Sequence, residues 1–64
     1  MQVNGKWYAH HDGLTLHALL SDLKIDQRTV AVMHADQVHR AGQIPDSPIA
    51  EPDVVEIVTM MQGG

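Results

Sequence analysis

Cysteine and phenylalanine are both absent from this sequence of 64 residues. Without thiols, the chain can form no disulfide, no zinc thiolate site and no cysteine nucleophile. Stability must come from packing, yet a chain this short buries only about 60% of the surface that it exposes when unfolded. Such a small core leaves little room for an enclosed pocket. The absences therefore favour a protein that acts through its surface or its chain end.

Long apolar runs and clustered positive charge are missing as well. No apolar stretch approaches the roughly 20 residues of a membrane-spanning helix, and the first residues show no signal peptide. We therefore expect a soluble, cytoplasmic protein without a membrane partner. Eight acidic residues outnumber four basic ones, for a net charge of −4. The basic residues are scattered and form no stripe that could follow a phosphate backbone, so nucleic acid is not an expected partner.

The patterns that are present predict one helix among several strands. Residues 1–10 are expected to form a hairpin, because Asn4-Gly5 is typical of a two-residue turn between strands. Thr15 is expected to cap a helix, since leucines follow at a spacing of i, i+3, i+4 and i+7 from Leu16 to Leu23. Further strands are expected over 30–34, near 38–40 and over 54–60. This order predicts an α+β fold, in which one helix packs across a mixed sheet of four to five strands. The first and last strands should be parallel neighbours at the centre of that sheet.

The sequence ends in Gly63-Gly64, directly after the last predicted strand. Because ordering glycine costs much conformational entropy, we expect a domain over 1–60 and a flexible tail over 61–64. A tail without side chains at Gly63 would thread a narrow channel in a partner. The carboxylate of Gly64 would then be the functional group at its tip. Once activated, for example as an acyl-adenylate, that carboxylate would react with a sulfur nucleophile to give a thiocarboxylate.

A docking surface is predicted beside this tail. Side chains alternate between the two faces of a strand, so Val55 and Ile57 should face the helix, while Glu56 faces solvent. Apolar residues that share the face of Glu56 would form an exposed patch for a partner. The alternative is that the sheet curls and these residues cover the edge of the core. The residues predicted to dock partners are Met33, Val58, Met60, Met61 and Gln62.

Other candidate groups carry no specific function. The five histidines lack the spacing of a metal site, so we expect solvated surface side chains and no bound metal. Trp7 and Tyr8 should point to opposite faces, one to the core and one to solvent, and the pattern leaves open which is which. No catalytic triad or phosphate loop is recognisable. The domain is therefore not expected to be an enzyme by itself.

Five segments in order along the chain match the pattern of a known family. They are Met1-Gln2-Val3-Asn4-Gly5, Thr15-Leu16-His17-Ala18-Leu19-Leu20, Val30-Ala31-Val32, Val54-Val55-Glu56-Ile57-Val58 and Gly63-Gly64. Through these segments the whole chain resembles the ThiS family, the ubiquitin-like sulfur carriers of thiamine thiazole synthesis. The resemblance has three departures in turn residues. Ala35-Asp36 replaces the usual Asn-Gly, Glu51-Pro52-Asp53 replaces the usual Asp-Gly-Asp turn, and His39-Arg40 replaces a common Pro-Arg.

This resemblance implies a β-grasp fold and a carrier role. It implies that an E1-like, ThiF-like enzyme uses ATP to adenylate Gly64, which then bears the sulfur, and that Gly63 threads the enzyme. The sulfur donor would be a group such as a cysteine desulfurase persulfide. A ThiG-like thiazole synthase would receive the sulfur, and the carrier itself would bind no cofactor. Two alternatives remain open: a carrier for molybdopterin synthesis or tRNA thiolation, and a non-catalytic ubiquitin-like interaction module.

Overall fold

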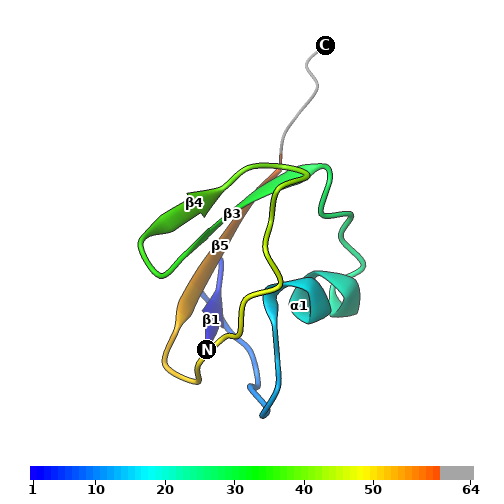
Figure 1. Ribbon diagram of the computed structural model, residues 1–64. Helices are drawn as coiled ribbons and strands as arrows, with labels where there is room; N and C mark the ends of the chain where they lie inside the picture. The colour runs from blue at the N-terminus through cyan, green and yellow to red at the C-terminus, as the bar shows by residue number, and fades with distance from the viewer. Residues whose placement is uncertain (60–64) are drawn as a thin grey trace.

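A computed structural model describes residues 1–59 of the chain, and residues 60–64 lie outside the described part. Two strands, one helix and three further strands follow one another, with the helix on one side of the sheet (Figure 1). The sheet has the strand order β2-β1-β5-β3-β4. The elements are β1 (Gln2–Val3), β2 (Lys6–Trp7), α1 (Leu16–Asp22), β3 (Val30–His34), β4 (Gln37–His39) and β5 (Val54–Thr59).

The first and last strands are parallel neighbours, as the sequence predicts. Gln2 pairs with Val54 and Val3 with Val55. On its other side β5 runs antiparallel to β3, from the pair His34 and Val55 to the pair Val30 and Thr59. The strand that leads to the C-terminal residues is therefore held on both sides, and the predicted α+β arrangement is confirmed.

Two tight turns set the registers of the outer strands. Asn4 (φ 52°) and Gly5 (φ 81°) both adopt the positive φ of a type I′ turn between β1 and β2. Ala35 (φ 53°) and Asp36 (φ 63°) do the same between β3 and β4, although an alanine in this conformation costs about 1–2 kcal/mol. This second two-residue turn keeps its geometry without the usual Asn-Gly. It starts β4 at Gln37, one residue earlier than predicted.

Helix α1 has a defined cap at each end. The Thr15 hydroxyl accepts a hydrogen bond from the Ala18 N–H at 3.2 Å, as expected of an N-cap. At the other end Lys24 has φ 59°, and its N–H and that of Ile25 donate to the carbonyls of Ser21 and Leu20. These are the two bonds of a Schellman motif, which ends the helix after Leu23. The described residues contain no helix long and apolar enough to cross a membrane.

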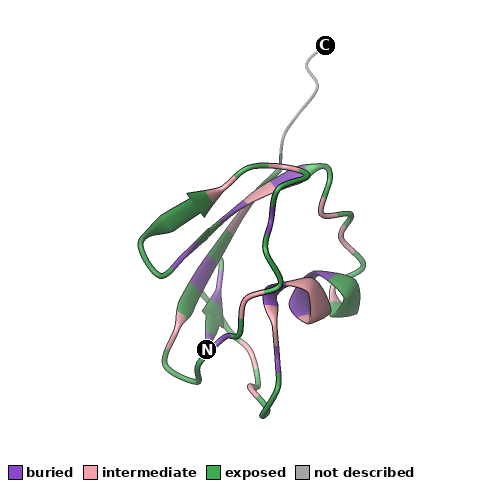
Figure 2. Ribbon diagram, viewed as in Figure 1, coloured by how far each residue is buried: buried purple, intermediate pink, exposed green. Residues whose placement is uncertain are grey.

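The core lies between α1 and the facing side of the sheet, where the buried residues of β3, β5 and α1 gather (Figure 2). The irregular segment 40–53 closes it by contributing Ile44 and Ile49. Backbone bonds hold this segment, because Leu16 N–H donates to the Ser47 carbonyl and Ile49 N–H donates to the Leu14 carbonyl, both at 2.9 Å. The buried apolar residues are Met1, Val3, Leu14, Leu16, Leu19, Leu20, Val30, Val32, Ile44, Ile49 and Val55.

Candidate functional site

The sheet has a second face, turned away from α1, which we call the outer face. Alternation along β5 buries Val55 and half-buries Ile57, while Glu56 and Val58 are exposed on the outer face. The same alternation along β3 buries Val32 and leaves Met33 exposed. Met33 pairs with Glu56 on one side and with Val38 on the other. Met33 and Val58 thus have the orientation that the sequence predicts, and they do not cover the edge of the core.

Exposed apolar side chains concentrate on this outer face. Within residues 1–59 the exposed large apolar residues are 37% to 73% accessible, and strand pairing places all of them on the same side of the sheet. Exposed apolar groups that gather on one face indicate a binding surface, whereas single ones need no explanation. They are Trp7, Met33, Val38, Val54 and Val58.

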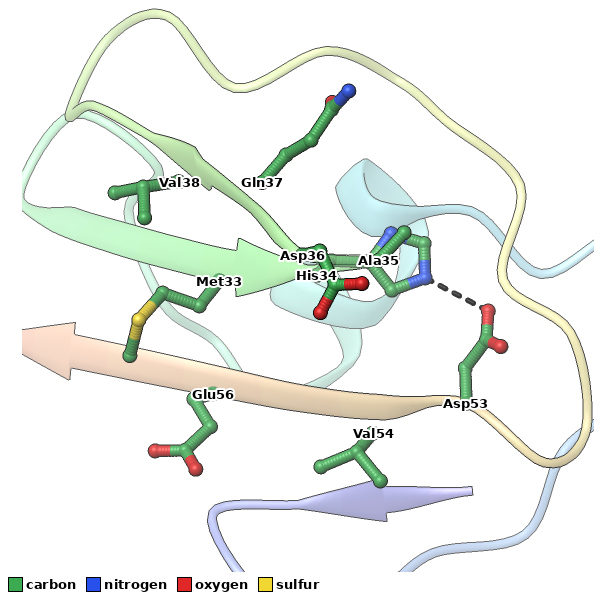
Figure 3. A pocket seen from close by; sticks show the side chains of 9 residues that line it. All are labelled: Met33, His34, Ala35, Asp36, Gln37, Val38, Asp53, Val54 and Glu56. Atoms are coloured by element: carbon green, nitrogen blue, oxygen red, sulfur yellow. Dashed lines mark hydrogen bonds and ion pairs between the residues drawn. The ribbon is translucent and has the colours of Figure 1, made fainter.

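A hollow of about 470 Å³ opens on the outer face around Met33 (Figure 3). Val38 lines it from β4 and Val54 from β5, so these two side chains and Met33 form its apolar part. Three carboxylates, of Asp36, Asp53 and Glu56, also line it. A partner that buries Met33 must therefore bring apolar atoms against Met33, Val38 and Val54, and it should bring positive charge to the carboxylates.

His34 and Asp53 form a buried polar link at one end of this hollow (Figure 3). His34 is only 7% exposed, and its Nε2 lies 2.8 Å from Asp53 Oδ2. The same carboxylate accepts a hydrogen bond from the Ala50 N–H at 2.9 Å. The Ala50 hydrogen bond and, after it, the His34 hydrogen bond hold the pKa of Asp53 below its usual range. The link joins the end of β3 to the turn before β5.

The expectation of solvated histidines is therefore wrong for His34, and two other histidines also make specific bonds. Nε2 of His10 lies 2.6 Å from the Ile49 carbonyl, and Nε2 of His17 lies 2.6 Å from the Ile44 carbonyl. Because a carbonyl oxygen only accepts, each Nε2 carries the proton. These bonds fasten segment 40–53 to the rest of the fold. In residues 1–59 no three histidine or carboxylate side chains gather as metal ligands would.

Only part of the predicted site falls within the described residues. The structure brings Met33 and Val58 to the outer face, whereas Met60, Met61, Gln62, Gly63 and Gly64 lie outside residues 1–59. The sequence did not predict that Trp7, Val38 and Val54 belong to the exposed apolar surface. Trp7 is exposed and Tyr8 is half-buried against the core, which answers the question that the pattern left open. The register of the first hairpin would have answered it, because the pairing of Trp7 with Gln2 places Trp7 on the outer face.

The fold and this face together define the class. One helix packed across a mixed sheet, with the first and last strands as central parallel neighbours, is the ubiquitin-like β-grasp architecture. The family model of the ThiS family matches residues 1–64. The chain is also 36% identical over 53 residues to the Sulfur carrier protein ThiS of Thermus thermophilus, a match that covers 83% of each chain. This protein therefore belongs to the ThiS family.

Proposed function

We propose that this protein is a sulfur carrier that uses the carboxylate of Gly64 and serves thiazole formation in thiamine biosynthesis. Membership of the ThiS family and the name of the Thermus relative support the carrier role. The observation that carries the proposal is the outer face. It gathers five exposed apolar side chains on the sheet whose central strand, β5, precedes the Gly63-Gly64 end by only a few residues.

In the proposed reaction the chain is a co-substrate of its partner enzymes. An oxygen of the Gly64 carboxylate attacks the α-phosphorus of ATP, which is bound by an E1-like, ThiF-like enzyme, and pyrophosphate leaves. The terminal sulfur of a donor persulfide, such as that of a cysteine desulfurase, then displaces AMP. A second thiol cleaves the resulting S–S bond and leaves a thiocarboxylate on Gly64. Because the first step consumes ATP, we place the protein in the cytoplasm.

The outer face would dock both the activating enzyme and a ThiG-like thiazole synthase. Met33 and Val58 would provide the centre of the contact, continued toward the chain end by Met60, Met61 and Gln62. Fully burying an aliphatic side chain of this size contributes about 1.5–3 kcal/mol, and these residues are already partly covered, so each would contribute less. Several together would suffice for a reversible complex. Such a complex suits a carrier that must leave one enzyme for the next.

Gly63 would allow the chain end to reach the catalytic centre of the partner. A residue without a side chain lets the chain end pass through a channel that is only as wide as a backbone. The bulk of a larger residue at this position would block the approach of Gly64. The carrier itself would hold no cofactor, since ATP is bound by the activating enzyme.

An ATP–pyrophosphate exchange assay with the cognate activating enzyme tests the first step. The full chain should stimulate exchange, and a chain that lacks Gly64 should not, although its circular dichroism spectrum should be unchanged. Equal exchange with both chains would contradict the assignment of Gly64. No exchange with the full chain, using an enzyme shown to be active on its own carrier, would contradict the carrier function.

A further inference from the structure

The side chain of Asn4 replaces a missing residue of strand β1. Its Oδ1 accepts a hydrogen bond from the Ile57 N–H at 2.7 Å, and its Nδ2 donates to the Ile57 carbonyl at 3.2 Å. The backbone N–H of Asn4 donates to the Val55 carbonyl at 3.0 Å. Asn4 therefore contacts β5 twice, once through its backbone and once, two residues further along β5, through its amide group.

This arrangement follows from the geometry of the first hairpin. The ladder between β1 and β5 ends at the pair Val3 and Val55, because the chain turns away at Asn4 and Gly5 with positive φ. Ile57 would then face the end of β1 with an unpaired N–H and carbonyl. A primary amide presents an N–H donor and a carbonyl acceptor on the same side, so the Asn4 side chain can pair with both the N–H and the carbonyl of Ile57 and extends the ladder by one residue. An alkyl or carboxylate side chain could not satisfy both groups of Ile57.

The position of this contact along β5 gives it a role beyond the turn. Among the described residues, it is the last hydrogen-bonded contact on the β1 side of β5. Val58 and Thr59 pair with Ala31 and Val30, on the β3 side. The chain continues from Thr59 toward Gly64, so Ile57 is the last point at which β5 is held from both sides.

We propose that Asn4 is a positioning residue for sulfur loading, which holds the end of β5, the strand that precedes Gly64 in the sequence, in place from the β1 side. This inference rests on the proposed function. When the amide is removed, β5 is held on one side only from Ile57 onward. The outer face still docks the activating enzyme, but Gly64 reaches the bound ATP in a smaller fraction of the complexes.

Two variants distinguish the role of the Asn4 amide group from the role of Asn4 in the turn. Asn4→Gly keeps the turn, because glycine accepts positive φ readily, and it removes both hydrogen bonds to Ile57. Asn4→Asp also tolerates positive φ and keeps an acceptor for the Ile57 N–H, but its second oxygen opposes the Ile57 carbonyl. Lys6→Ala is the control, since Lys6 is exposed in the same hairpin and outside the outer face.

Amide hydrogen exchange tests the contact in the isolated protein. In Asn4→Gly the Ile57 amide should exchange about fivefold to tenfold faster relative to that of Val32, a buried residue of β3 that serves as the reference. Asn4→Asp should give a smaller increase, and Lys6→Ala should give none. An unchanged ratio in Asn4→Gly would overturn the proposal.

Loading kinetics with ATP, the cognate activating enzyme and a persulfide donor test the consequence. Asn4→Gly should lower kcat severalfold while KM stays close to that of the wild type, because docking is unaffected. A kcat equal to that of the wild type would overturn the role of Asn4 and leave the carrier function intact. A wild-type chain that takes up no sulfur would overturn the carrier function and this inference with it, although the exchange data would still report the contact.

Discussion

Removing the Asp53 carboxylate should destabilise the fold far more than its place near the surface implies. Asp53→Ala deletes the hydrogen bonds to the Ala50 N–H (2.9 Å) and to His34 Nε2 (2.8 Å). The first is an ordinary turn contact, whose loss costs about 0.5–1.5 kcal/mol. The second matters more, because His34 is 7% exposed and a buried polar group left without its partner costs about 1–3 kcal/mol.

The sum is about 1.5–4.5 kcal/mol, which is large for this protein. A domain of this length has a free energy of unfolding of about 3–10 kcal/mol. In domains of 60–100 residues each 1 kcal/mol shifts Tm by about 4–8 °C, so Asp53→Ala should lower Tm by at least about 6 °C. Glu51→Ala is the matched control, because Glu51 is an exposed carboxylate in the same turn.

Urea unfolding followed by far-ultraviolet circular dichroism measures the difference directly. The exposed Trp7 is a poor reporter of core unfolding, so fluorescence is the weaker choice. A double-mutant cycle with His34→Ala should show the two losses to be less than additive, since either change breaks the same bond. If Asp53→Ala were as stable as Glu51→Ala, the His34–Asp53 link would contribute nothing and the reasoning would be refuted.

Three further predictions concern pH, docking and the helix end. The folded-state pKa of Asp53 is depressed, so the stability that its carboxylate contributes should be complete above the unfolded pKa of about 3.9 and lost as pH falls through the folded pKa. Acid titrations of unfolding should therefore show a smaller loss of stability for Asp53→Asn than for the wild type, and equal losses would contradict this origin. Met33→Lys should raise KM for the activating enzyme at least about tenfold, and Tm should change little because the lysine can pair with Glu56 across the strands. Ser21→Lys, on the exposed side of α1, should change neither quantity, and an unaltered KM for Met33→Lys would place docking elsewhere. Lys24→Gly should raise the free energy of unfolding by up to about 1 kcal/mol in urea, since Lys24 has φ 59° at the end of the helix, and a loss of stability would argue against strain there.

The elements with strong periodicity were predictable from the sequence. The leucine spacing from Leu16 to Leu23 and the alternation over 54–59 depend on local geometry, and each produced the expected helix or strand. The parallel pairing of β1 with β5 followed from the order of these elements. Alternation also placed Met33 and Val58 on the outer face.

Features that depend on contacts between distant residues were not predictable in this way. Ile44 and Ile49 enter the core from a segment with no period, because backbone bonds to Leu14 and Leu16 hold that segment in place. His34 has the parity of a core residue, but its partner Asp53 lies 19 positions away. The amide of Asn4 bonds a residue 53 positions away, and the turn alone explained the choice of Asn-Gly. Each of these polar contacts forms only once the sheet has brought its two partners together.

The central claim is that the Gly64 carboxylate of this protein accepts sulfur. Intact mass spectrometry tests it most directly, after incubation of the full chain with ATP, the cognate activating enzyme and a persulfide donor with a reducing thiol. The account predicts that the mass rises by the difference between one sulfur and one oxygen atom, that the gain maps to the C-terminal fragment, and that it requires ATP. An unchanged mass, with an activating enzyme that loads its own known carrier in a parallel reaction, would contradict the account.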